Sequence, residues 1–202
     1  MIKRIWPMRL PDMDPETLAK LVFCFENDPE RSDGIISGAQ DSIGICMPGL
    51  VRHYYDKFYW PLKIETCQDD AILDWIESHL IMIPMEPRRP GCSVVEGKDI
   101  TEPKVKALAK AADDCWNAIM NKDLKAFAAA YKASFEAQTA MFPAMIQGSV
   151  QDYIDKYSAL DDVLAWKMPG AGGGGYLACV VKDASAFCQN HPEAIALKIR
   201  RK

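Results

Sequence analysis

The chain has 202 residues, of which 49% are hydrophobic and 26% are charged, so it could form one large domain or two small ones. Its formal charge of −4 argues against a general nucleic-acid-binding protein, because such proteins present basic surfaces to phosphates. No apolar run approaches the about 18 residues that would suggest a membrane-spanning helix, and the N-terminus lacks the apolar stretch of a secretory signal.

The first hundred residues predict two helices and three strands. In chain order these are a helix at 14–26, strands at 51–55 and 59–65 that form a hairpin, a helix at 70–77 and a buried strand at 79–85. Between the first helix and the hairpin lies a segment of small residues, 32–44, that is bracketed by glycines. After residue 85, repeated prolines predict a loop.

The second half of the chain predicts mainly helices, followed by two strands. In chain order these are helices at 101–119, 121–138, 144–157 and 160–166, a glycine loop, a strand at 176–182, a helix at 183–190 and a strand at 194–199. Because strands and helices come partly in blocks, the order predicts an α+β fold. We expect an antiparallel or mixed sheet of about four to five strands, with helices packed on one face.

Seven cysteines are scattered without any C-x-x-C pair, which is typical of free thiols in a reducing cytoplasm. The three histidines (His53, His79 and His191) are isolated in the sequence and lack the spacing of metal ligands. We therefore expect a cytoplasmic protein without a metal site of its own, and with neither nucleic acid nor a membrane as a partner.

Five of the twelve glycines fall between Gly170 and Gly175, between an expected helix and an expected strand. Glycine allows positive φ angles and close approach of a ligand to the main chain, and consecutive free N–H groups can bind an anion. The spacing is not that of a P-loop, because no Lys-Ser/Thr pair follows, and the order of elements is opposite to that of a dinucleotide-binding loop. A phosphate site and a simple helix C-cap followed by a turn both remain open.

Two segments together resemble the GHMP kinase superfamily, which includes galactokinase, homoserine kinase and mevalonate kinase. One is the run Lys167-Met168-Pro169-Gly170-Ala171-Gly172-Gly173-Gly174-Gly175, which is similar to that family's third, C-terminal motif. The other is Gly38-Ala39-Gln40-Asp41-Ser42-Ile43-Gly44, which resembles the segment that carries the proposed catalytic aspartate in the heptose-phosphate and fucose kinase-like branch. The resemblance covers nearly the whole chain, at the level of a C-terminal kinase half.

The resemblance implies an ATP-dependent sugar or sugar-phosphate kinase, with ATP and Mg²⁺ held mostly by an N-terminal half. It implies that Asp41 is the catalytic base and that Gly38 and Gln40 contact the substrate. The implied nucleotide-contacting residues are Lys167, Gly170, Ala171, Gly172, Gly173, Gly174 and Gly175. Alternatives from the residues themselves are that Asp41 is a helix N-cap and that Lys167 complements a helix C-terminus.

Two departures from the family pattern matter. The string Gly-Leu-Gly-Ser-Ser, whose loop holds the nucleotide phosphates in the family, does not occur in the 202 residues. Pro169 also replaces the usual Ser/Thr and so removes a hydroxyl and a backbone N–H. We expect residues 1–202 to form a single C-terminal-type domain, with residues 1–50 derived from the junction between the halves. Such a domain would be inactive alone, and activity would need a separate N-terminal half unless the chain is a fragment of a longer protein. We also expect the lone chain to self-associate.

Two other hypotheses remain open from the sequence. The first is a non-catalytic binding or regulatory module that keeps the kinase fold. The second is an unrelated α+β protein whose glycine loop is only a turn. Two arginines in the proline-bracketed stretch 86–90 could lie near a phosphate, although a solvated loop is the simpler interpretation.

Overall fold

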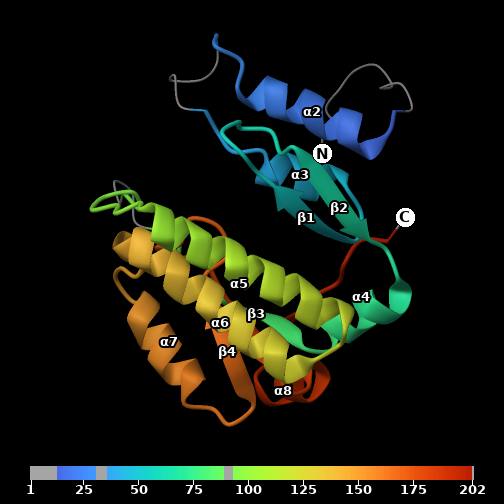
Figure 1. The fold of residues 1–202 in the computed structure, drawn as a ribbon. Helices are drawn as coiled ribbons and strands as arrows, with labels where there is room; N and C mark the ends of the chain where they lie inside the picture. The colour runs from blue at the N-terminus through green and yellow to red at the C-terminus, as the bar shows by residue number, and fades with distance from the viewer. Residues whose placement is uncertain (1–12, 31–35, 89–92, 202) are drawn as a thin grey trace. The chain divides into compact units, whose positions relative to one another are not determined.

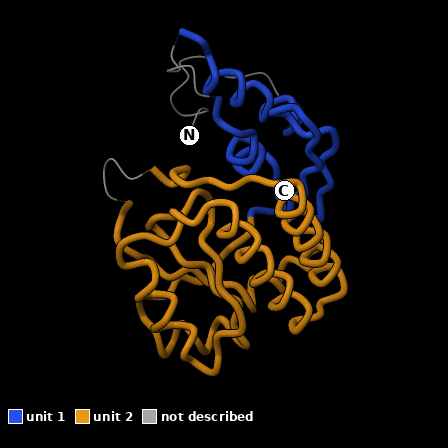
Figure 2. The backbone as a smooth tube through the Cα atoms, turned by 60° about the vertical axis from the view of Figure 1, so that its left-hand side comes forward, with its two compact units in different colours: residues 1–68, 200–202 blue, residues 69–199 orange. Residues whose placement is uncertain are grey.

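The computed structural model describes residues 13–30, 36–88 and 93–201 (Figure 1). The chain divides into two compact units, of which unit 1 comprises residues 1–68 with 200–202, and unit 2 comprises residues 69–199 (Figure 2). Among the described helices, none combines the length and the apolar character needed to cross a membrane.

Unit 1 consists of two helices and a two-stranded antiparallel sheet. These are α2 (Pro15–Glu26), α3 (Gln40–Cys46), β1 (Leu50–Tyr54) and β2 (Lys63–Cys67). The helix α2 begins where expected, because the side chain of Asp14 accepts a hydrogen bond from the Thr17 amide. Its buried face packs Ala19 against Ile43 of α3.

The predicted hairpin of unit 1 is present, but its connection is longer than expected. Residues 55–62 lie outside both strands, whereas the sequence pattern predicted a break of only three residues. The ring of Trp60 lies 5.8 Å from that of Phe23, and Pro61 follows it. This segment therefore leaves the sheet because Trp60 packs on α2 and because proline cannot donate a ladder hydrogen bond.

Unit 2 contains a four-stranded antiparallel sheet with the strand order β4-β5-β3-β6. The strands are β3 (Leu80–Pro84), β4 (Val163–Lys167), β5 (Tyr176–Val181) and β6 (Ile195–Ala196). In the central pair, Ile81 lies opposite Cys179 and Ile83 opposite Leu177, and all four residues are buried. The predicted α+β class is therefore confirmed.

The helices of unit 2 pack around this sheet (Figure 1). They are α4 (Asp70–Glu77), α5 (Glu102–Met120), α6 (Leu124–Met141), the 3₁₀ turn η1 (Pro143–Met145), α7 (Val150–Ser158) and α8 (Ala184–Asn190). The long helices α5 and α6 lie side by side, and the side chain of Asp123 caps the start of α6 by accepting from the Ala126 amide. All residues of β5 from Leu177 to Val181 are buried, so this strand is covered on both faces.

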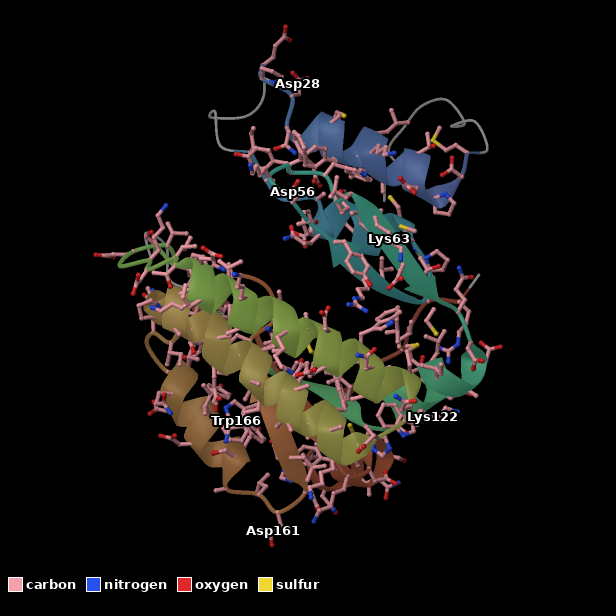
Figure 3. The ribbon with its side chains drawn as sticks, in the orientation of Figure 1. Asp28, Asp56, Lys63, Lys122, Asp161 and Trp166 are labelled. Atoms are coloured by element: carbon pink, nitrogen blue, oxygen red, sulfur yellow. The ribbon has the colours of Figure 1, made fainter. Side chains whose placement is uncertain are left out.

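The helix predicted at 160–166 is wrong, because residues 163–167 form strand β4. Val163 and Ala165 are buried while their neighbours are only half-buried, which is the period of a strand with one face in the core. Asp161 and Asp162 form an exposed turn before it, and Asp161 points away from the unit (Figure 3). A short apolar run of this length fits a strand or a helix equally well by periodicity.

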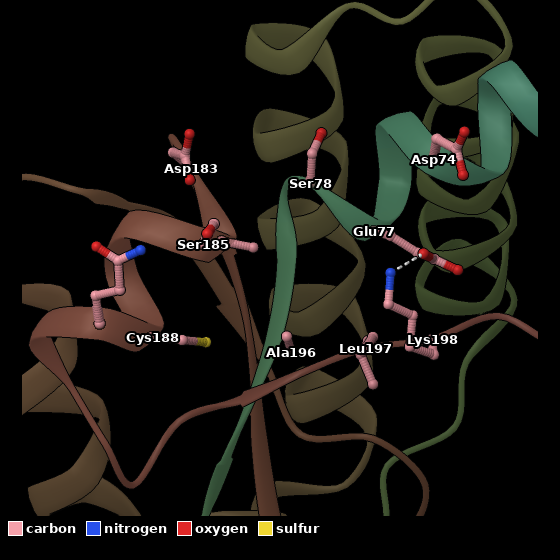
Figure 4. Close-up of a pocket in the computed structure, with 11 residues that line it drawn as sticks. Asp74, Glu77, Ser78, Asp183, Ser185, Cys188, Ala196, Leu197 and Lys198 are labelled. Carbon is pink, nitrogen blue, oxygen red and sulfur yellow. Dashed lines mark hydrogen bonds and ion pairs between the residues drawn. The ribbon is translucent and has the colours of Figure 1, made fainter.

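The strand predicted at 194–199 is shorter than expected and ends after Ala196. Beyond it, the Ile199 amide and the Lys198 ammonium both donate to the carboxylate of Glu77, at 2.7 and 2.8 Å. Glu77 ends α4, and its side chain is only 6% exposed. These bonds draw the chain out of the sheet, and they border a cavity of about 640 Å³ between α4, α8 and β6 (Figure 4).

Candidate functional site

The glycine loop, residues 168–175, connects β4 to β5 and therefore joins two antiparallel strands. The interpretation as a helix C-cap followed by a turn is wrong, because no helix precedes the loop. All five glycines have positive φ, with angles of 69° at Gly170, 77° at Gly172 and Gly173, 143° at Gly174 and 94° at Gly175. Residues other than glycine rarely adopt positive φ angles, so the path of the loop depends on glycine.

Two of these glycines also permit close packing. A Cβ at Gly174 would lie 2.6 Å from the Glu86 carbonyl oxygen, and one at Gly172 would lie 2.9 Å from the Met145 Cβ. At Gly170 and Gly175 a Cβ would meet nothing within 4 Å. Packing therefore explains glycine at 172 and 174, whereas at 170 and 175 only the backbone conformation requires it.

Hydrogen bonds fix the loop at Gly173 and Gly175 and leave three of its other amides as free donors. The Gly175 amide donates to the Glu86 carbonyl at 2.9 Å, and the Gly173 amide donates to the Met145 carbonyl at 2.8 Å. Within the described part of the chain, the amides of Gly170, Ala171 and Gly174 have no hydrogen-bond partner. Such free N–H groups in a positive-φ loop are suited to an anion.

Arg88 supplies a positive charge at this loop. Its Nε donates to the Gly172 carbonyl oxygen at 3.0 Å, while the side chain remains exposed. Arg88 therefore lies in an exposed loop, as the simpler interpretation held, but one of its nitrogen atoms is tied to the glycine loop. Arg89 lies outside the described residues. The contact joins positions 84 residues apart in the chain, so no local sequence pattern predicts it.

Lys167 does not complement a helix C-terminus, because it is the last residue of strand β4. Its Nζ donates to the Ser134 Oγ on α6 at 3.0 Å, and that hydroxyl donates to the Tyr131 carbonyl. Burial of the amine lowers the pKa of Lys167 to about 8. In this structure the side chain is therefore held against α6.

We expect this lysine to make stability depend on pH. Between about pH 8 and its ordinary pKa of 10.5, the Lys167 amine binds more protons in the unfolded chain than in the folded one, so stability rises with pH. Lys167→Met should flatten this rise and stabilise the protein at pH 7 by on the order of 2 kcal/mol. Urea unfolding at pH 7 and 10 measures both effects, with the exposed Lys125→Met as control. Parallel pH profiles for Lys167→Met and wild type would contradict the expectation.

Gly38, Gln40 and Asp41 come together at the start of α3, in unit 1. The Gln40 side chain folds back over Gly38, where a Cβ would collide with the Gln40 Oε1. The N-cap of α3 is Ala39, so the interpretation of Asp41 as the cap is wrong, and Asp41 is an exposed residue of the first turn. These three residues therefore lie in unit 1, whereas the glycine loop and Lys167 lie in unit 2.

A pocket of about 390 Å³ adjoins the glycine loop in unit 2. Its lining consists of Glu86, Pro87, Gln147, Gly148, Ser149, Gly173 and Gly174. The Ser149 hydroxyl, just before α7, donates to the Glu86 carboxylate across 63 positions of sequence. Sequence reasoning did not find Glu86 or Ser149 as site residues, because no motif links positions so far apart.

The chain resembles solved kinases in fold. It is similar to a Campylobacter jejuni protein assigned as a sugar kinase (16% identity, TM-score 0.59, covering 96% of this chain and 56% of that one). It is also similar to a D-glycero-D-manno-heptose 1-phosphate kinase from Bacteroides thetaiotaomicron (14% identity, TM-score 0.58, covering 95% and 53%). A mevalonate kinase matches at 12% identity with a TM-score of 0.57, covering 100% of this chain and 61% of that one.

No protein-family model matches the sequence, and no curated protein matches it significantly. At 12–16% identity the solved structures establish the fold, and the resemblance to the GHMP kinases is confirmed at that level. The chain spans little more than half the length of these kinases.

Proposed function

We propose that this chain is the C-terminal half of an ATP-dependent kinase that phosphorylates a hydroxyl group of a sugar or sugar phosphate. The observation that carries the proposal is the positive-φ glycine loop, with free amides and Arg88 against it, on a fold shared with sugar kinases. In phosphoryl transfer the protein acts mainly by positioning and by stabilising charge, and backbone amides with an arginine suit both tasks. The reaction belongs in the cytoplasm, where free thiols such as the six described here persist.

In this proposal residues 170–175 lie beside the triphosphate of ATP, and Mg²⁺ is held mostly by an N-terminal half. Asp41 takes the proton of the acceptor hydroxyl. The hydroxyl oxygen of the acceptor then forms a bond to the γ-phosphorus of ATP, while the bond from that phosphorus to ADP breaks. Gly38 and Gln40 contact the acceptor next to it. Lys167 reaches a phosphate only by leaving Ser134, so its role in nucleotide binding requires a side-chain rearrangement.

Activity in this proposal requires an N-terminal kinase half, because the Gly-Leu-Gly-Ser-Ser loop does not occur in the 202 residues. The chain associates either with that half or with a second copy of itself. Residues 1–202 act as one C-terminal-type domain, in which residues 1–50 derive from the junction between the halves. Large apolar side chains of unit 1 are exposed and could serve such an interface, namely Leu21, Phe25, Ile45, Phe58 and Leu62.

Calorimetric titration with Mg-ATP tests the proposal. The 202-residue chain alone should show no more than millimolar affinity, because the family's main phosphate-cradling loop is absent from its sequence. Affinity should rise at least tenfold when a polypeptide with the Gly-Leu-Gly-Ser-Ser loop is added, since one extra charged hydrogen bond is worth about that factor. Micromolar affinity of the lone chain, or no gain on addition, would contradict it.

A second function, a non-catalytic binding or regulatory module, is favoured by one observation. Packing against Met145 and Glu86 alone accounts for glycine at 172 and 174, so these two positions do not require a nucleotide. Turnover in the assembled protein separates the two functions.

A further inference from the structure

The pocket beside the glycine loop contains a carboxylate that neither motif includes. We propose that it binds an uncharged ligand rich in hydroxyl groups, and that Glu86 accepts hydrogen bonds from those hydroxyls. The inference rests on the proposed function, in which this ligand is the phosphoryl acceptor. It implies that the acceptor is a neutral polyol.

Ser149 holds Glu86 in place. It is the residue before α7, where a serine side chain usually caps the helix, yet its hydroxyl makes no capping bond and donates to Glu86. A carboxylate offers about four acceptor positions, so Glu86 can accept from further hydroxyls. Gly148, with a φ of 57°, turns the chain into α7, and a Cβ there would meet nothing within 4 Å.

The polar groups of the lining match a polyol. Acceptors come from Glu86, and a donor comes from the Gly174 amide, which has no partner in the described part of the chain. A sugar hydroxyl both donates and accepts, so it can satisfy both groups at once. A volume of about 390 Å³ is sufficient for a small ligand of this kind.

The same lining disfavours the other ligands of a kinase. The negative charge of Glu86 repels a phosphate in the pocket, and Arg88 is not part of the lining. Among the described residues that line the pocket, none carries an aromatic ring on which a nucleobase could stack. In this assignment the free amides of Gly170 and Ala171 bind the anion, whereas the Gly174 amide, which is equally free, donates to the neutral ligand.

Amide NMR of the full chain tests this assignment, with D-mannose, D-galactose and myo-inositol as neutral probes and inorganic phosphate as the anionic probe. At least one polyol should shift the signals of Gly148, Ser149, Gly173 and Gly174, whereas phosphate should leave Gly148 and Ser149 unchanged. Glu86→Gln and Ser149→Ala should each weaken polyol binding by about tenfold, because each disturbs a hydrogen bond to a charged group. Glu136→Gln, at an exposed position of α6, is the control.

Three outcomes would overturn the inference: no polyol shifts these signals, phosphate occupies the pocket instead, or Glu86→Gln binds the polyol as wild type does. Thermal unfolding of each variant shows whether the fold is intact. Mg-ATP affinity of the assembled protein separates this inference from the proposed function. If Glu86→Gln and the wild type bind Mg-ATP equally and no polyol binds, only the assignment of the pocket fails. If the assembled wild-type protein does not bind Mg-ATP at all, the proposed kinase function is contradicted.

Discussion

Asp41→Asn should lower the turnover number of the assembled kinase by about 10²–10⁴-fold, because the acceptor hydroxyl then loses its general base. The substitution keeps the size of the side chain, and Asp41 is exposed and does not cap α3, so the fold should be unaffected. The effect should fall on turnover, with little change in the Michaelis constant for ATP. A coupled assay of ADP release measures both quantities.

Asp56→Asn is the matched control for this experiment. Asp56 is an exposed aspartate of unit 1 in the connection between β1 and β2, and the proposal gives it no role (Figure 3). It should retain wild-type turnover. If Asp41→Asn also retains it, Asp41 is only a solvated residue of a helical turn, and the non-catalytic module becomes the better account of the chain.

Gly174→Ala should destabilise unit 2 by about 2–5 kcal/mol, because two costs combine. The new methyl group would lie 2.6 Å from the Glu86 carbonyl oxygen and 2.8 Å from the Arg88 amide nitrogen, and the backbone φ of 143° is itself unfavourable for alanine. Gly170→Ala should cost only about 1–2 kcal/mol, since the left-handed backbone is strained there but the space is open. Urea unfolding of the full chain measures both losses.

Gly44→Ala provides a control of opposite sign. Gly44 lies within α3, and a Cβ there meets nothing within 4 Å. Alanine should therefore stabilise unit 1 by up to about 1 kcal/mol, as expected for an open helical position. Equal losses for Gly170→Ala and Gly174→Ala would contradict the close approach of the loop to residues 86–88.

The sequence predicted best those elements whose local signals agree with their packing. Helix α2 has an Asp-Pro start and β3 is a compact apolar run, and both lie within a few residues of their predicted positions. The sequence predicted the bounds of an element poorly where a contact between distant residues determines where the element ends. Trp60 packs on Phe23 and thereby lengthens the connection of the hairpin, and Glu77 draws Lys198 and Ile199 out of the last strand.

The candidate site shows the same division. The glycine loop was located correctly from its composition, but the element before it was wrong, because a short apolar run does not distinguish strand β4 from a helix. The contacts of Arg88 with Gly172 and of Ser149 with Glu86 join residues 84 and 63 positions apart. Such pairs follow from the topology of the sheet, which a single sequence does not reveal.

The central claim of the proposal is that the main chain at 170–175 lies beside the phosphates of a bound nucleotide. Paramagnetic broadening of amide NMR signals by Mn²⁺-ATP in the assembled protein tests it most directly, because broadening depends on distance from the metal. The signals of Gly170, Ala171 and Gly174 should broaden together, while those of Ser78 and Ser185 at the other cavity of unit 2 stay sharp. If the loop signals stay sharp while nucleotide is bound, the claim is contradicted.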